Sequence, residues 1–255
     1  MIAGADFKLK YSGSVLGYVW SIVKPLALFS MLYAVFGHIF HLGSISHYYP
    51  VSLLMGIVLF NFFSDATQLG MWSLVVRESL LRKLSFPRLI IPTSATITAT
   101  ITFGINALVV AAFVGWNGIA PRWSWFLLLP LALELYVVLL GVSLLLSALY
   151  VRLRDVAQVW ELVLQLLFYA SPIIYPIGFL PPFARKLVFL NPVTQVLQDA
   201  RALVLYPDLP PNRITVNVAF NSPFGRLLPI GIGLGIFVAG FFFFRREEPW
   251  FAERV

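Results

Sequence analysis

Residues 152–176 read RLRDVAQVWELVLQLLFYASPIIYP and hold the signals around which the chain is organised. Two arginines and an aspartate precede a mostly apolar run, which prolines at positions 172 and 176 then interrupt. Proline lacks an N–H donor and clashes with the preceding turn, so we expect the helix to end near Ser171. Within the run, polar side chains recur at intervals of three, four and four residues and share one helical face: Gln158, Glu161, Gln165 and Tyr169.

This polar stripe needs protein or water beside it if the helix crosses a membrane, because hydrocarbon cannot satisfy its hydrogen bonds. The residues alone leave two interpretations open. The stripe is either a seam of hydrogen bonds between helices or one wall of an aqueous pathway.

The composition predicts an integral membrane protein. The chain has 255 residues, of which 60% are hydrophobic and 11% charged, and its mean hydropathy is +0.87. The formal net charge is +7. The basic residues form short clusters between apolar runs, which is typical of membrane loops and argues against a nucleic-acid partner.

Several kinds of chemistry are excluded by what the sequence lacks. There is no cysteine, so disulfides, thiolate metal sites and a cysteine nucleophile are ruled out. No Gly-rich phosphate loop ends in Lys followed by Ser or Thr, so this chain should not hydrolyse ATP. His38, His41 and His47 have no supporting ligand cluster. We therefore expect no metal, no cofactor and no catalytic residue on this chain.

The apolar runs predict an all-α integral membrane protein with six transmembrane helices in one domain, 1–255. The expected spans lie at about 25–42, 51–76, 93–111, up to 150, within 152–176, and 224–244. Twelve Lys and Arg residues fall on the side of the two termini and five on the other side. This asymmetry predicts cytosolic N- and C-termini.

The segment before the first span, residues 6–24, predicts an amphipathic helix at the membrane interface, with lysines toward anionic lipid. An extension of the first span is the alternative. The residues proposed for the interface helix are Lys8, Lys10, Tyr11 and Trp20.

Three further spans carry patterns of their own. In the first, aromatic side chains repeat at four, three and four residues, a pattern that suits either sugar stacking or helix packing: Phe29, Tyr33, Phe36 and Phe40. In the third, small residues from Thr93 to Ala111 predict close helix packing. The second has a polar stripe with the ionisable Asp65, and the fourth contains Glu134; we assign neither acid a role.

The region 178–222 is too long to lack structure in a compact protein. It predicts two short helices, 182–190 and 192–206, with Asn191 as the cap and Pro192 at the first helical position. An amphipathic surface hairpin is the alternative.

The motifs together resemble the type-2 ATP-binding-cassette permeases that export polysaccharides. The resemblance covers nearly the whole chain. It rests on the Phe-Tyr-x-Ser-Pro-Ile-x-Tyr ending at 168–175, on Tyr11, Trp20 and the neighbouring Gly-Ser and Leu-Gly steps, on Arg82-Lys83 followed by Phe86-Pro87-Arg88, on Asn191-Pro192 and on the Phe-Ala-Glu tail at 251–253.

This resemblance implies roles for specific segments. Residues 77–91 would be the coupling helix that docks on an ATPase, through Arg82, Lys83, Phe86, Pro87 and Arg88. The export channel would be lined by Phe29, Tyr33, Phe36, Phe40, Glu161, Gln165 and Tyr169. Residues 178–222 would be an extracytoplasmic re-entrant gate that includes Asn191, Pro192 and Arg201.

The resemblance also implies an assembly and a substrate. The chain would form a homodimer with two ATPase subunits, which would bind ATP and Mg, in the bacterial cytoplasmic membrane. The substrate would be a lipid-diphosphate-linked polysaccharide such as O-antigen, teichoic acid or galactan.

Two other classes of function are kept as alternatives. A membrane glycosyl- or prenyl-transferase needs clustered acids, whereas Asp65, Glu134 and Glu161 are scattered along the sequence. An ion-coupled carrier is disfavoured by the shortage of charges within the spans.

Overall fold

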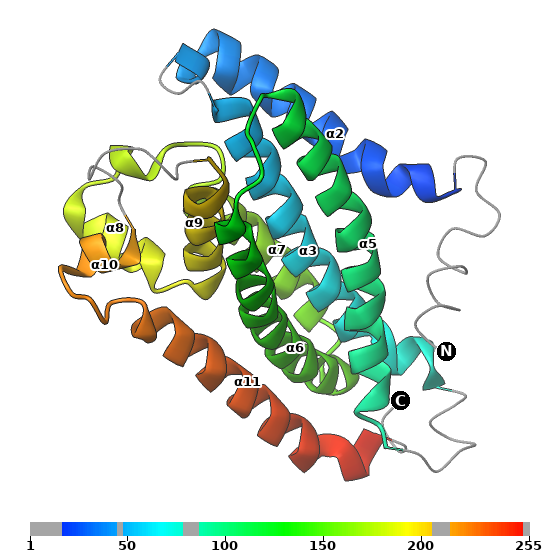
Figure 1. Ribbon diagram of the computed structural model, residues 1–255. Helices are drawn as coiled ribbons and strands as arrows, with labels where there is room; N and C mark the ends of the chain where they lie inside the picture. The colour runs from blue at the N-terminus through cyan, green and yellow to red at the C-terminus, as the bar shows by residue number, and fades with distance from the viewer. Residues whose placement is uncertain (1–16, 45–47, 79–86, 206–214, 252–255) are drawn as a thin grey trace.

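The structure is a computed structural model that describes residues 17–44, 48–78, 87–205 and 215–251. Every regular element in these ranges is helical, and none is a strand. The all-α prediction is therefore confirmed for this part of the chain. Figure 1 shows a bundle of long helices in which the short helices α8, α9 and α10 gather toward one end and α11 runs to the opposite end.

Five helical segments are long and apolar enough to cross a membrane. They are α2 with its π-helical continuation η2 (Trp20–Ile39), α3 (Tyr49–Val76), α5 (Ile90–Trp116), η4 with α6 (Trp123–Arg152), and α11 with η6 (Leu227–Trp250). The remaining predicted span, the fifth in chain order, corresponds to α7 (Val156–Ala170), which has only 15 residues. A helix of that length measures about 22 Å, less than the ~30 Å of a bilayer's hydrocarbon core. Length alone therefore supports five spans, not the predicted six.

Helix α3 lies at the centre of the bundle. It packs against α5 and α6 along its length and also contacts α2, α7 and α9. Its hydroxyl groups are satisfied locally, since Thr67 Oγ1 donates to the Phe63 carbonyl at 2.9 Å and Ser73 Oγ to the Gly70 carbonyl at 2.6 Å. A helix buried on most sides can keep such residues because none of them needs an outside partner.

Helices α6 and α11 pack unusually closely through two glycines. A Cβ built on Gly240 would overlap the backbone of Gly141, and one built on Gly141 would overlap the backbone of Phe237. Small residues of this kind let two membrane helices approach backbone to backbone.

A second, smaller apolar cluster closes the end of the bundle at which α11 ends. It joins the end of α3, the start of α5, the end of α6 and the C-terminal segment, through Leu74, Ile91, Leu144, Phe244 and Phe251. The Arg88 guanidinium donates a hydrogen bond to the Glu248 carbonyl at the same place. The segment that leads into α5 is thereby tied to η6 (Glu248–Trp250).

The predicted boundary between the interface helix and the first span is not seen. Residues 1–16 lie outside the described residues, Gly17–Val19 form a short 3-10 turn, and α2 runs from Trp20 to Leu32 through Pro25. Trp20 therefore starts the spanning helix. Pro25 lies inside this helix, so it supplies no N–H for an intrahelical bond to the Ser21 carbonyl.

The predicted packing role of the small residues in α5 is wrong for the second half of the stripe. Thr96 is buried, but Thr100, Gly104 and Ala111 are exposed. A Cβ on Gly104 would meet no atom within 4 Å. Small residues permit close approach without compelling it, and in the described part of the chain no other helix approaches Gly104.

The two helices predicted between the fifth and last spans are confirmed, nearly to the residue. Helix α8 runs from Pro182 to Phe189 and α9 from Pro192 to Leu205. A 3-10 turn, η5 (Ile177–Phe179), precedes them, and α10 (Val216–Phe220) leads into α11 (Leu227–Glu247).

Candidate functional site

The polar stripe of α7 faces outward along its whole length. Gln158, Glu161, Gln165 and Tyr169 are all exposed, and Leu164 is the only residue that α7 buries. The main contacts of α7 with other helices are with α3 and α6.

The polar stripes of α3 and α7 meet at one point. A cavity of about 170 Å³ lies between the two helices and is lined by Gln68 from α3 and by Gln158 and Glu161 from α7. Gln68 Nε2 donates to Ser64 Oγ at 3.0 Å within α3. The sequence predicts each stripe separately, and only the fold brings them together.

The non-helical exit from α7 is held by one arginine. Ser171 to Ile174 are buried although they lack helical hydrogen bonding. Arg201, which is 5% exposed, donates to the Pro172 carbonyl at 2.6 Å and to the Ile173 carbonyl at 2.9 Å. It also donates to the Ser52 carbonyl through two nitrogens, at 3.1 and 2.8 Å. The fork of donors on one guanidinium thus satisfies the two buried carbonyls of the α7 exit and ties them to α3 at Ser52.

Other groups complete this junction. The Tyr49 hydroxyl donates to the Ile174 carbonyl at 2.9 Å. Gly56 is required beside Arg201, since a Cβ there would overlap Nη2. We call the set formed by Ser52, Pro172, Ile173 and Arg201 the arginine junction.

The start of α9 is capped as the sequence predicts. Asn191 Oδ1 accepts a hydrogen bond from the Val193 N–H at 3.0 Å, and Pro192 is the first helical residue. Asn191 Nδ2 and the Thr194 hydroxyl both contact Ser171 Oγ, at 3.3 and 3.1 Å. The cap therefore also fixes α9 to the end of α7.

The aromatic stripe of α2 is divided between packing and exposure. Phe29 stacks with Tyr33 at 5.7 Å between ring centroids and meets Phe113 of α5 edge-on at 5.6 Å. Tyr33 also lies 6.4 Å from the Tyr49 ring. Phe36 stacks on Phe40, which is 63% exposed. The stripe thus begins inside the protomer and emerges at the end where η2 (Tyr33–Ile39) adopts a π-helix.

Asp65 lines a polar cavity on another side of α3. The cavity has a volume of about 620 Å³ and lies between α2, α3 and α5, with Lys24, Asn61 and Asn106 in its lining. It combines a cation, an anion and two amides at membrane depth, which is the environment an intramembrane Asp requires.

Glu134 belongs to a polar cluster formed by α6, α9 and α11. Gln195 Nε2 donates to Asp199 Oδ2 at 2.7 Å and lies 3.5 Å from Glu134 Oε2. Arg226 makes a 2.7 Å ion pair with Asp199. Burial raises the pKa of the Asp199 carboxyl, and the Gln195 hydrogen bond and the Arg226 charge oppose that rise.

Some predicted site residues cannot be placed. Lys8, Lys10, Tyr11, Arg82, Lys83 and Phe86 lie outside the described residues. Pro87 and Arg88 are described and immediately precede α5, on the end of the bundle that holds the C-terminal segment.

Sequence reasoning missed the residues that hold the exit from α7. Tyr49 bonds Ile174, Thr194 bonds Ser171 and Arg201 bonds Ser52, over separations of up to 149 positions and without any motif. A usable signal was present, since Arg201 must find acceptors once it is buried.

Comparison with known proteins gives a consistent family. The sequence profile described as "ABC-2 type transporter" matches residues 1–205. An O-antigen export system permease protein RfbA from Klebsiella pneumoniae is 28% identical over 238 residues, which is 93% of this chain and 89% of that protein.

Two further relatives span similar lengths. An O-antigen export system permease protein RfbA from Myxococcus xanthus is 26% identical over 252 residues, covering 98% of this chain and 92% of the relative. The polysialic acid transport protein KpsM of Escherichia coli is 22% identical over 234 residues, covering 91% and 89%.

Proposed function

The chain belongs to the ABC-2 type transporter family, and from this premise we propose that it is the membrane subunit of an ATP-driven exporter of lipid-diphosphate-linked polysaccharide. Relatives from three bacterial species are described as permeases for O-antigen export or as a polysialic acid transport protein. The exporter would reside in the bacterial cytoplasmic membrane, with both termini in the cytosol as the distribution of Lys and Arg predicts.

The observation that carries this proposal is the exposed polar stripe of α7, which leads to the non-helical exit held by the arginine junction. Glutamine, glutamate and tyrosine side chains on one exposed face offer weak, replaceable hydrogen bonds and ring contacts. A polymer can slide along such a surface, because no single contact is strong enough to hold it. The outward face of α7 finds its partner in a second copy of the chain, whose equivalent helices would close the channel around the glycan.

In this arrangement α7 also crosses the membrane, which brings the number of spans to six. Its short helix is extended by residues 171–176, of which 171–174 are buried and are held by the arginine junction in place of helical hydrogen bonds. Helices α8 and α9 form the gate region beside the channel exit, where Asn191, Pro192 and Arg201 fix α9 to the end of α7.

Energy would come from two ATPase subunits that bind ATP and Mg. Residues 77–91 would contact them, with Arg82, Lys83, Phe86, Pro87 and Arg88 as the coupling residues, and the interface helix with Lys8, Lys10 and Tyr11 would move with them. The Arg88 bond to the Glu248 carbonyl would pass a displacement of this segment to the end of α11.

The test replaces two coupling residues, Phe86→Ala together with Arg88→Ala, in the full complex. We expect ATP hydrolysis by the partner to continue while export of the glycan is lost, measured as polysaccharide at the cell surface. The control is Arg152→Ala, which removes an exposed arginine at the nearby end of α6. Normal export by the double variant would contradict the coupling assignment.

The transferase alternative has a separate test. Glu134 lies in the α6, α9 and α11 cluster, Asp65 lines the α2, α3 and α5 cavity, and Glu161 is on α7, so no pair of these acids shares a site. Turnover of a lipid-linked sugar by the purified chain, with no ATPase present, would overturn the exporter assignment.

A further inference from the structure

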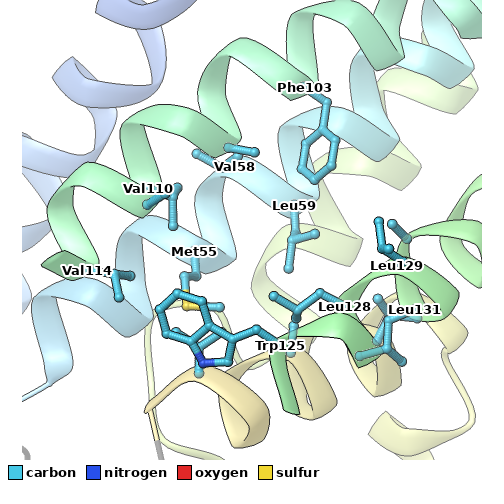
Figure 2. Close-up of a pocket in the computed structure, with 16 residues that line it drawn as sticks. Met55, Val58, Leu59, Phe103, Val110, Val114, Trp125, Leu128, Leu129 and Leu131 are labelled. Atoms are coloured by element: carbon cyan, nitrogen blue, oxygen red, sulfur yellow. The ribbon is translucent and has the colours of Figure 1, made fainter. Parts of the chain in front are cut away.

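A large apolar cavity lies between α3, α5, α6 and α9, away from the stripe of α7. Its volume is about 290 Å³, and all of its lining side chains are apolar apart from the indole N–H of Trp125. Figure 2 shows Leu59, Phe103, Val110 and Leu128 pointing toward a common space.

Water is a poor occupant for such a space. Protein interiors are close-packed, and an apolar cavity of about 150 Å³ stays dry and takes up benzene. The cavity in this chain is about 290 Å³ and gives a water molecule no set of hydrogen-bonding partners. The apolar lining of this cavity therefore favours an apolar ligand.

The small residues of α5 create this space and open it sideways. Ala107 and Ala111 line the cavity, and Ala111 is exposed at its mouth. Leu129 lines the opposite side and is 70% exposed. Leu108 and Leu133 beside them are also exposed, so the cavity is continuous with the apolar surface that the spans present to the membrane.

The position of the cavity matches one leaflet of a bilayer. Trp116 and Trp123 are exposed at the ends of α5 and η4, as aromatic residues at the headgroup level are. From Val114 to Phe103 the lining of α5 extends for about 16 Å, close to the ~15 Å depth of one leaflet's hydrocarbon.

A polar group at the same end lacks a partner. Trp125 Nε1 and the neighbouring Ser124 Oγ are buried, and no hydrogen-bond partner for either is found in the described part of the chain. An ester carbonyl just below the headgroup would accept from the indole N–H. None of the lining residues is basic, which disfavours the diphosphate of an isoprenoid carrier.

We propose that this cavity, the α9 pocket, binds one acyl chain of a membrane glycerolipid, with the lipid's ester carbonyl accepting a hydrogen bond from Trp125 Nε1. One wall of the pocket is Val196, Ala200 and Val204 of α9. The bound chain therefore packs against α9, the helix that carries Arg201.

The experiment measures lipid bound to the purified full chain. Phosphatidylglycerol with a photoactivatable diazirine near the middle of one acyl chain is mixed into nanodiscs, and the crosslinked peptides are identified. We expect labels on α5, η4, α6 and α9 at residues that line the pocket. Native mass spectrometry after delipidation should retain one phospholipid per chain.

Two variants fill the pocket from different helices, Ala107→Phe from α5 and Ala132→Phe from α6. Each should reduce pocket labelling at least fivefold and lose the retained lipid. Their controls, Leu108→Phe and Leu133→Phe, add bulk on the neighbouring exposed face and should leave both readouts unchanged. Trp125→Phe should weaken retention while keeping the labelled positions.

Three outcomes would overturn the proposal. The first is equal pocket labelling in the filled variants and their controls, with folding verified by unchanged thermal unfolding. The second is preferential labelling of the pocket by a photoactivatable polyprenyl phosphate. The third is a crosslink between two copies of the chain through Leu129, which would make the pocket a protomer interface.

Discussion

Helices α3 and α7 are both apolar helices with a polar stripe, yet the fold gives them opposite surroundings. Helix α3 is enclosed by its neighbours, and its stripe lines two cavities of the bundle through Asp65 and Gln68. Helix α7 buries only Leu164 and exposes its whole stripe. The polar residues of a stripe therefore do not reveal its purpose until the number of packed neighbours is known. Substitutions that perturb the packed part should lower stability, and those on α7 should act only on transport.

The largest loss of stability is expected at the arginine junction. Arg201→Ala leaves the carbonyls of Pro172 and Ile173 buried without their donor and breaks the link to Ser52. Each unsatisfied group costs about 1–3 kcal/mol, so the free energy of unfolding should fall by about 2 kcal/mol or more. Reversible unfolding of the purified chain in mixed micelles measures this change. Arg201→Lys keeps the charge but not the fork of donors, so its free energy of unfolding should fall less. An Ala variant as stable as wild type would show that the arginine junction does not stabilise the fold.

A smaller loss is expected where α6 and α11 touch. Gly240→Val forces the two backbones apart, because its side chain would overlap Gly141. Overpacking of this kind costs about 1–3 kcal/mol. Gly235→Val on the same helix is the matched control, since a Cβ there meets no atom within 4 Å. Equal unfolding free energies for the two variants would show that the close α6–α11 contact is not formed.

A loss of at most about 1 kcal/mol in the free energy of unfolding is expected for Arg226→Ala. The Arg226 side chain is 44% exposed, and solvent screens ion pairs of this kind. The variant should also move the pKa of Asp199 further upward, since a charge that lowers it has been removed. A group with a raised folded-state pKa contributes stability that is present at low pH and lost as the pH rises. The variant should therefore differ most from wild type above the pKa of Asp199, as unfolding measured against pH would show.

No measurable change in stability is expected for the pair Glu161→Leu and Gln165→Leu, because both positions are exposed in the protomer. Surface changes of this type fall within about ±0.5 kcal/mol. Glycan export should nevertheless be strongly reduced, since the stripe loses two hydrogen-bonding groups. Leu162→Ala and Leu166→Ala, also exposed on α7, form the control pair. Wild-type export in the stripe variant, scored by surface polysaccharide, would indicate a packing seam.

The parts of the fold that could be predicted are those with local causes. Apolar runs of membrane length predict the long helices, and the Asn191-Pro192 step predicts the start of α9 to the residue. The arginine junction, the Gly141–Gly240 contact and the α9 pocket could not be predicted, because each joins residues far apart in the sequence. The stripe of small residues on α5 shows the same limit. Its pattern is compatible with packing, but the arrangement of neighbouring helices leaves Gly104 uncovered.

The arginine junction also has a consequence for biosynthesis. The Pro172 and Ile173 carbonyls precede the arginine that satisfies them by 29 and 28 residues. At translation rates of about 5–20 residues per second, these carbonyls wait roughly 1 to 6 s for their donor. The nascent exit from α7 must be shielded through that interval by lipid, by the insertion machinery or by a chaperone. A chain stopped before codon 201 would keep these two carbonyls unsatisfied and be a substrate for membrane quality control.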